Sequence, residues 1–257
     1  MSNLSVEPNP RVTLRIAYRD DDLVVVEKPT GMPTQPGKGH TRDTLLNGLF
    51  GIEEFGAKLQ NLGRDRDFGL LHRLDRPTSG LLLVGLRPRA YDAMRDAFAK
   101  RQVKKFYWAV VAKGPAHDSG LIKRPILEVE DQQKLARISP TGKPAITAYR
   151  VLQRVVGMAL VECRPLTGRL HQIRVHMESI GCPVLGDKEY APRAVAEAAR
   201  RLALHAHRLA FTHPVTGEKI DVRSKWPSDL RSLLGRNGLK RPDLSQPARG
   251  EESESEE

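Results

Sequence analysis

One carboxylate stands between two arginines in the stretch Leu71-His72-Arg73-Leu74-Asp75-Arg76-Pro77-Thr78-Ser79-Gly80-Leu81-Leu82-Leu83-Val84. A guanidinium beside a carboxylate favours its ionised form, and an ionised oxygen is what a nucleophile or a general base requires. Pro77 and Gly80 favour a bend before the apolar strand, and functional groups are often carried on loops that rigid elements hold. Asp75 is therefore a candidate catalytic residue, although a turn-capping aspartate beside two surface arginines would give the same pattern.

Five further motifs extend this pattern along the chain. They are DDLVVVEKPTGMPTQPG (residues 21–37), KKFYWAVVAKG (104–114), GKPAITAYRVL (142–152), LTGRLHQIRVHMESIGCPVLGDKEY (166–190) and LHAHRLAFTHPVTGE (204–218). Together with HRLDRPTSGLLLV they resemble, in the same order, the motifs of the RluA-like RNA pseudouridine synthases, in which the aspartate of H-R-L-D isomerises a uridine. The matching stretches cover nearly the whole chain, so the resemblance implies an RNA isomerase on the pseudouridine synthase catalytic fold.

The resemblance also implies which side chains catalyse the reaction. Asp75 would be the catalytic residue, Tyr107 would lie against the target base, and Arg174 would orient Asp75 through a bidentate contact that lysine would not reproduce. A strand turns Tyr107 to the side opposite Phe106 and Trp108, so that one face can be core while the other meets a ligand. The alternatives are a core tyrosine and an arginine that only anchors its helix.

Four further residues are expected to contact the substrate. Arg73 is similar to the family arginine that fills the gap or contacts phosphate when the nucleotide moves. We expect the other contacts from Arg76, Arg169 and His72, with His72 acting as a hydrogen-bond partner beside the catalytic loop rather than as a general base.

The reaction that the resemblance implies explains these residue types. Converting uridine to pseudouridine breaks the bond between N1 and C1′, turns the uracil over and rejoins it through C5. No redox change or outside energy source is needed, so we expect no cofactor. Asp75 would either attack C1′ or take the 2′ proton, and the sequence leaves both routes open.

Two other functions remain compatible with the sequence. The first is a catalytically idle RNA-binding or ribosome-assembly protein on the same fold, which the intact Asp75, Tyr107 and Arg174 argue against. The second is a glycoside-cleaving hydrolase, which would need a second carboxylate as its acid. The matched motifs contain no acidic residue that is clearly placed as such a partner.

The charge of the chain indicates a polyanionic partner. The 257 residues carry a formal net charge of +11, and the last seven include five Glu and no basic residue, so the first 250 carry +16. A body that basic attracts nucleic acid, although a basic surface can also serve solubility alone. We therefore expect structured RNA, ribosomal or transfer, as the partner in RNA processing, while the particular uridine is not specified by charge.

Metal, disulfide and membrane features are not apparent. Cys163 and Cys182 are the only cysteines and form no C-x-x-C pair, and His205 and His207 lack a Cys or carboxylate at ligand spacing, so no metal site is expected. The N-terminus has no apolar signal region, and no stretch approaches the roughly 18 apolar residues of a membrane span. The sequence predicts a cytoplasmic monomer without membrane contact or an obligatory protein partner.

Short strand-like runs dominate the chain and favour an α+β fold with a mixed, largely antiparallel central sheet and flanking helices and loops. One helix is predicted to begin at Pro88, and others over residues 170–180 and 193–203. For the second of these, Thr167 is the predicted N-cap and Gly181 the predicted C-terminal stop.

The domain organisation is expected to be simple. Residues 11–240 would form a single catalytic domain. Residues 1–10 and the acidic residues 241–257 are polar and contain proline, which predicts disorder at both ends. Many RluA-like relatives carry a small S4-type RNA-binding domain ahead of the catalytic one, and the residues before Val12 leave no room for it here. RNA contact is therefore expected from the catalytic body itself.

Overall fold

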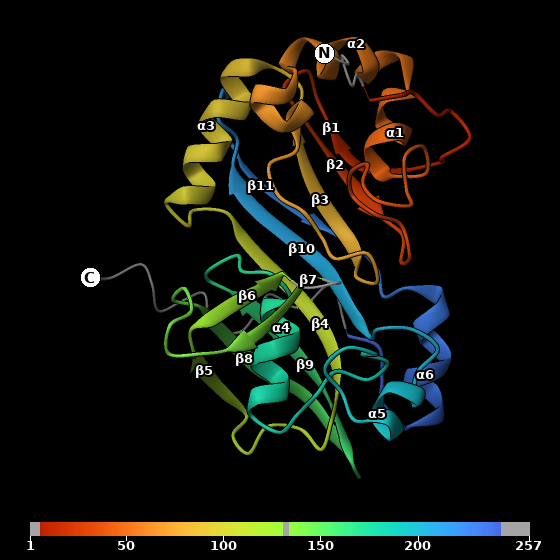
Figure 1. Cartoon of the computed structure of the whole chain (residues 1–257), viewed down its shortest axis with the longest axis vertical. Coiled ribbons are helices and arrows are strands. Elements are labelled where there is room, and N and C mark those ends of the chain that lie inside the picture. The colour runs from red at the N-terminus through yellow and green to blue at the C-terminus, as the bar shows by residue number, and fades with distance from the viewer. Residues whose placement is uncertain (1–5, 131–133, 243–257) are drawn as a thin grey trace.

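A computed structural model describes residues 6–130 and 134–242 of the chain (Figure 1). The strands are β1 Arg15–Arg19, β2 Leu23–Lys28, β3 Ser79–Gly85, β4 Lys104–Ala112, β5 Ser119–Lys123, β6 Ile126–Glu130, β7 Lys134–Ile138, β8 Ile146–Val155, β9 Met158–Pro165, β10 Leu204–Thr212 and β11 Lys219–Arg223. The helices are α1 Leu45–Phe50, α2 Glu53–Leu62, α3 Pro88–Ala99, α4 Gln172–Ser179, α5 Arg193–Glu197 and α6 Arg231–Arg236, with 3-10 segments η1 Arg64–Gly69 and η2 Ser228–Leu230.

Nine strands form one sheet in the order β1-β2-β3-β10-β4-β9-β8-β5, and β11 pairs with the C-terminal part of β10. Neighbouring strands are antiparallel except β3 and β10, which run parallel through the pairs Ser79 with His205 and Gly80 with Ala206. The hairpin of β6 and β7 stands apart as a second, two-stranded sheet. The predicted α+β class with a mixed, largely antiparallel sheet is confirmed.

β3 carries the apolar run of the opening stretch, and all of its residues are buried. Leu82 and Val84 pack with α1 and α2 in one core, whereas Leu81 and Leu83 pack with α3 in another. Successive side chains of a strand point to opposite faces, so helices on both sides explain why this run is unbroken rather than alternating.

The two parts of the sheet join where β3 runs beside β10. Gly80 has φ of +122°, and a Cβ at this position would fall on the backbone of Ala206. Only glycine adopts this conformation readily and permits so close an approach. Gly80 therefore fixes the junction that begins four residues after Asp75.

α4 and the β6–β7 hairpin lie on the same face of the sheet (Figure 1). Val175 of α4 packs with Ile126 and Ala136 of the hairpin. The N-cap of α4 is His171, and the predicted Thr167 cap is wrong. Thr167 does not reach the helix amides because its Oγ1 donates to Gln172 Oε1 at 2.6 Å and accepts from a strand amide.

The helix predicted over residues 193–203 is shorter, because α5 ends at Glu197. Beyond it the backbone bonds to neighbouring segments instead of to itself. Ala203 N donates to Leu185 O at 2.9 Å, and Ala203 O accepts from Val110 N at 3.0 Å. These contacts guide the chain into β10.

The N-terminal residues that the structure describes are ordered against α1, unlike the disorder predicted for residues 6–10. Val6 is buried, and Asn9 N donates to Asn47 O at 2.9 Å. The remainder of both predicted disordered ends, residues 1–5 and 243–257, lies outside the described residues. Among the helices of the described chain, none is long and apolar enough to cross a membrane.

Candidate active site

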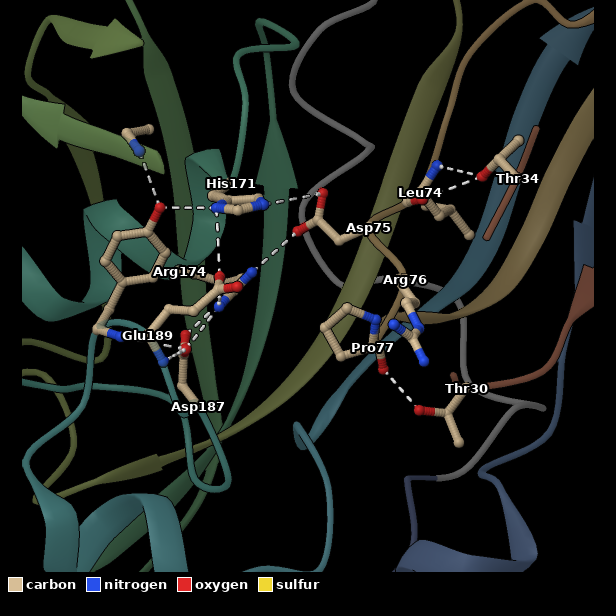
Figure 2. A network of polar contacts seen from close by, with 12 residues as sticks. Thr30, Thr34, Leu74, Asp75, Arg76, Pro77, His171, Arg174, Asp187 and Glu189 are labelled. Atoms are coloured by element: carbon tan, nitrogen blue, oxygen red, sulfur yellow. Dashed lines mark hydrogen bonds and ion pairs between the residues drawn. The ribbon is translucent and has the colours of Figure 1, made fainter. Parts of the chain in front are cut away.

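A cleft of about 820 Å³ collects the residues singled out in the sequence. Asp75, Tyr107 and Arg174 all line it, and they come from the loop before β3, from β4 and from α4. Figure 2 shows the Asp75 carboxylate pointing from its loop toward His171 and Arg174. Three distant parts of the chain thus bring the three predicted catalytic side chains to one place.

The loop that carries Asp75 is held by the segment that follows β2. Thr34 Oγ1 donates to Leu74 O at 3.0 Å, and Thr30 Oγ1 donates to Pro77 O at 2.7 Å (Figure 2). The Asp75 side chain remains 23% exposed. A partly exposed carboxylate therefore stands on a backbone whose carbonyl groups are anchored on both sides of it.

Lys28 is fully buried beneath the same loop. Its Nζ donates to the carbonyls of Pro29, Met32 and Arg76 at 3.0, 2.7 and 3.2 Å. Three acceptors satisfy an ammonium group, which has three donors. Burial lowers the pKa of Lys28 to about 7, although the charge of Asp75 opposes the shift. Lys28 thereby ties β2 to the Asp75 loop.

Arg174 is buried and faces three carboxylates. Its Nε and Nη2 donate to Asp187 Oδ2 and Oδ1 at 2.8 and 2.6 Å, and Nη2 also donates to Glu189 Oε2 at 2.6 Å. Its Nη1 lies 3.6 Å from Asp75 Oδ2. The predicted bidentate contact with Asp75 is therefore wrong, and Arg174 makes this contact with Asp187. The buried Asp187 carboxylate accepts from both Nε and Nη2, so these donors do not reach Asp75.

The carboxylates around Arg174 outweigh the cost of burying its charge. Burial lowers the pKa of Arg174, but the hydrogen bond and charge of Asp187, with the charges of Asp75 and Glu189, raise it overall. Sequence reasoning found no acidic partner in the matched motifs, yet Asp187 and Glu189 lie in one of them. Neither lines the cleft, so they neutralise Arg174 rather than supply a second acid there.

His171 faces Asp75 from the start of α4. Its Nε2 lies 4.0 Å from Asp75 Oδ1, and its Nδ1 lies 2.6 Å from Tyr190 Oη and 3.5 Å from Glu189 Oε2. Burial lowers the pKa of His171, while the charge of Asp75 opposes the shift. The imidazole is thus enclosed between the predicted catalytic carboxylate and a tyrosine hydroxyl.

Tyr107 lines the cleft with Asp75 but is only 8% exposed. Its two aromatic neighbours turn to the other face of β4, where the Trp108 ring stacks on His207 with centroids 3.8 Å apart and Phe106 lies 6.4 Å from the same imidazole. Burial raises the pKa of Tyr107, and the charge of Asp75 adds to the shift. The hydroxyl therefore stays protonated at neutral pH.

Three of the four predicted substrate contacts line the cleft, namely Arg73, Arg169 and His72. Arg76 does not. Its Nε donates to Gly31 O at 3.0 Å, and the side chain lines a neighbouring hollow that continues past His171. The short turn after Asp75 points Arg76 away from the carboxylate, as Figure 2 shows.

His72 is hydrogen-bonded to the backbone of β3. Its Nε2 accepts from Leu83 N at 3.0 Å. Burial lowers the pKa of His72 to about 3, and the charge of Lys105 adds to the shift. A neutral imidazole that accepts a strand amide is suited to supporting the loop rather than to transferring protons.

Basic side chains surround the site. Within the described residues, the cleft is lined by Arg73, Arg101, Lys104, Lys105, Arg164 and Arg169 in addition to Arg174. Such groups can contact phosphates along a nucleic acid backbone. The local charge of the cleft therefore has the sign that the overall composition predicted.

A separate cluster of Asp20, Asp22 and His213 has the spacing of metal ligands. His213 Nδ1 accepts from the amides of Val215 and Thr216 at 3.3 and 3.0 Å, and its Nε2 lies 3.1 Å from Asp20 Oδ2. The cluster joins the loop after β1 to the loop after β10 and lies outside the cleft.

Known protein families were compared with the chain, and one of them matches it. A family model described as RNA pseudouridylate synthase matches residues 22–179. The chain belongs to this family. It is therefore an RNA pseudouridine synthase, an isomerase that forms pseudouridine in RNA.

The relatives of this pseudouridine synthase include bacterial enzymes. It is 38% identical over 221 residues to the uncharacterized RNA pseudouridine synthase YlyB of Bacillus subtilis (strain 168), covering 86% of this chain and 72% of that protein. It is also 38% identical over 243 residues to ribosomal large subunit pseudouridine synthase D of Neisseria meningitidis serogroup A, covering 90% of this chain and 63% of that protein.

Solved structures of two human proteins share the fold. These are RNA Pseudouridylate Synthase Domain Containing 4 and Domain Containing 1, each with a TM-score of 0.69 and 27% sequence identity. The alignments cover 89% and 94% of this pseudouridine synthase and 94% of each human chain.

Four side chains near Asp75 and Arg174 were not predicted from the sequence: Lys28, His171, Asp187 and Tyr190. All four lie inside the motifs that carry the resemblance. Lys28 and Asp187 each follow an apolar run, which is a signal that the sequence does carry. A charged residue next to a buried run is seldom buried unless it is paired, so each could have been predicted to have a partner. The bond between His171 and Tyr190 had no local signal, because it depends on how α4 packs.

Proposed function

We propose that this pseudouridine synthase isomerises one or more uridines in the RNA of the large ribosomal subunit, with Asp75 as the catalytic carboxylate. The observation that carries the proposal is the position of Asp75 at a cleft that Tyr107 also lines, beside the buried Arg174. Transfer RNA is the alternative substrate. The relative in Neisseria meningitidis is named for the large ribosomal subunit, which favours ribosomal RNA.

The chemistry requires an ionised carboxylate close to the sugar. The bond between N1 and C1′ breaks, a bond between C5 and C1′ forms, and the C5 proton leaves while N1 gains one. Asp75 either forms a bond to C1′ that the base later displaces or accepts the 2′ proton. Arg174, whose Nη1 lies 3.6 Å from Asp75 Oδ2, would orient the carboxylate in both routes.

The base must leave its stack to reach the cleft. Unstacking costs a few kcal/mol, and stacking on one aromatic ring returns about 1 to 3 kcal/mol. Tyr107 lines the cleft and is the aromatic group proposed to meet the uracil. The basic residues around the cleft would hold the flanking phosphates.

The test is chemical mapping of pseudouridine across total RNA from cells with and without this gene. We expect at least one large-subunit site to lose pseudouridine without the gene, and the wild-type gene to restore it. Asp75→Asn should not restore it, because the amide keeps the size of the side chain but removes its charge. General acid or base help alone is worth about 100- to 10,000-fold.

Each other outcome has a defined meaning. No change at any site would refute the proposal, and a change confined to transfer RNA would show that the substrate class is wrong. Restoration by Asp75→Asn would remove Asp75 as the catalytic residue. Purified protein that leaves abasic sites and free uracil would be a hydrolase, and RNA that is bound but unchanged would indicate an idle binding protein.

A further inference from the structure

We propose that His171 is a positioning residue that holds the Asp75 carboxylate for catalysis, and that the hydroxyl of Tyr190 fixes the tautomer in which His171 does so. This inference rests on the proposed function, because it gives His171 a role only if Asp75 is the reacting group.

The first observation is that each oxygen of Asp75 faces a different nitrogen. Oδ1 lies 4.0 Å from His171 Nε2, and Oδ2 lies 3.6 Å from Arg174 Nη1 (Figure 2). Arg174 Nη1 is buried and has no hydrogen-bond partner among the described residues. Contacts of this kind often tighten when substrate binds. Two donors on two oxygens would stop rotation of the carboxylate, whereas Arg174 alone would leave one oxygen unconstrained.

The second observation is a chain of hydrogen bonds that sets the imidazole tautomer. Ala136 N donates to Tyr190 Oη at 3.0 Å, and Tyr190 Oη lies 2.6 Å from His171 Nδ1. With one lone pair of the hydroxyl oxygen taken by the amide proton, the hydroxyl is placed to donate its own proton to Nδ1. The proton of neutral His171 then resides on Nε2 and faces Asp75. The opposite tautomer would place a lone pair against the carboxylate.

The charges around the imidazole fit this assignment. His171 is faced by Asp75, Glu189 and Asp187 and by the guanidinium of Arg174, and burial lowers its pKa against the pull of the carboxylates. Glu189 is the competing acceptor, at 3.5 Å from Nδ1. The same Glu189 oxygen already accepts a hydrogen bond from Arg174 Nη2 at 2.6 Å, so it is a weaker acceptor for a proton on His171 Nδ1.

The third observation is the backbone of His171. Its φ is +51°, in the left-handed region, and its side chain makes no capping bond to α4. A residue other than glycine persists there only when its surroundings impose the conformation, and such positions cluster at functional sites. Here the conformation aims the imidazole between Asp75 and Tyr190 instead of leaving it to cap the helix.

The kinetic test compares four variants with the wild type. His171→Leu removes both ring nitrogens, and His171→Gln keeps a side-chain N–H near the position of Nε2. Tyr190→Phe removes only the hydroxyl, and Tyr91→Phe is its control, because Tyr91 is a buried tyrosine of α3 that does not line the cleft. The probe is a transcript of large-subunit ribosomal RNA with tritium at uracil C5, since pseudouridine formation releases the C5 hydrogen.

We expect a loss in kcat without a matching change in RNA affinity. A misplacement of about 1 Å can cost about 100-fold, so His171→Leu should lower kcat by roughly that factor. His171→Gln should recover at least about tenfold of the loss, Tyr190→Phe should lie between them, and Tyr91→Phe should match the wild type. If His171→Leu turns over as fast as the wild type, or if His171→Gln is no better than His171→Leu, His171 does not position Asp75.

The spectroscopic test needs no RNA. Nitrogen-15 NMR of the histidine-labelled protein, with the His171 signals identified by their loss in His171→Gln, should show Nε2 protonated and Nδ1 bare. Tyr190→Phe should change that pattern while the thermal midpoint changes little. A wild-type spectrum with the proton on Nδ1 would overturn the inference. Wild-type protein that releases no tritium would instead count against the proposed substrate or function, and the spectrum would still decide the tautomer.

Discussion

The buried pair of Arg174 and Asp187 carries a large stability cost if it is broken. The two side chains are 2% and 1% exposed and share two hydrogen bonds. Asp187→Ala should lower the free energy of unfolding by about 3 to 5 kcal/mol, because it leaves a buried cation short of its main partner. Glu189→Gln, at a side chain that is 35% exposed, should cost less than about 1 kcal/mol. Urea unfolding of the two variants checks both values, and equal costs would contradict the assignment of Asp187 as the main partner.

Tyr107 allows the ring and the hydroxyl to be tested separately. Since burial raises its pKa, the hydroxyl stays protonated through the range in which the enzyme is assayed. Tyr107→Phe should therefore keep RNA binding and the fold, and its kcat reports only on the hydroxyl. Tyr107→Leu also removes the stacking surface and should reduce turnover further, by up to about 3 kcal/mol or 100-fold. A thermal transition abolished in both variants would favour a core tyrosine.

At this scale the sequence predicted which side chains meet at the cleft but not the partners that hold them. Asp75, Tyr107 and Arg174 were found through motifs, and all three line one cleft. The prediction of Asp75 as the bidentate partner of Arg174 was wrong, because the partner is decided by how far each carboxylate lies from the guanidinium edges. That distance is set by tertiary packing and leaves no trace in spacing along the chain.

Among the elements, β3 is held by two neutral histidines and should be sensitive to acid. His72 accepts from Leu83 N, and His205 Nδ1 lies 2.9 Å from Ser79 Oγ. Burial lowers the pKa of both imidazoles to about 3, whereas the unfolded value is about 6.5. The unfolded chain binds more protons below pH 6.5, so stability should fall as the pH is lowered from about 6.5 toward 3.

Urea unfolding at pH 7, 6 and 5 measures this effect. The slope of the unfolding free energy against pH is proportional to the number of protons taken up on unfolding. His72→Gln removes at most one of these protons, so it should reduce the slope by at most about 1.4 kcal/mol per pH unit. His117→Gln, at an exposed position, serves as the control and should leave the slope unchanged. An identical slope in the wild type and His72→Gln would show that His72 is not held neutral by the fold.

Elements were predicted best where burial leaves a clear pattern in the sequence, either a one-sided apolar repeat or an unbroken apolar run. α3 begins at Pro88, and β3 follows the apolar run, as their patterns indicated. The β6–β7 hairpin was not predicted, because among its described side chains only Ile126 and Ala136 are buried against α4, and the pattern of its other residues alternates weakly. The start of α4 was misplaced because the left-handed His171 carries no local signature.

For the whole molecule, the basic charge around the cleft predicts strongly salt-dependent RNA binding. If the six basic residues of the cleft each neutralise a phosphate, affinity should fall by about 300- to 2,000-fold between 50 and 200 mM salt. Arg73→Ala should lower the slope of log affinity against log salt by about one. Arg11→Ala, at an exposed position outside the cleft, should not. Filter binding with the ribosomal transcript measures the slopes, and affinity independent of salt would contradict the assignment.

The narrow parallel contact between β3 and β10 also has a consequence for folding. It joins residues 126 positions apart in sequence, Ser79 and His205, whereas β1 pairs locally with β2 and β8 pairs locally with β9. Contacts between distant parts of a chain form slowly, because a large loop must close first. Asp75 precedes β3, and Arg174 belongs to the part that packs on β7 to β9, so the cleft exists only after this closure. A nascent chain can therefore hold much of its secondary structure and still be unable to act on RNA until this contact has formed.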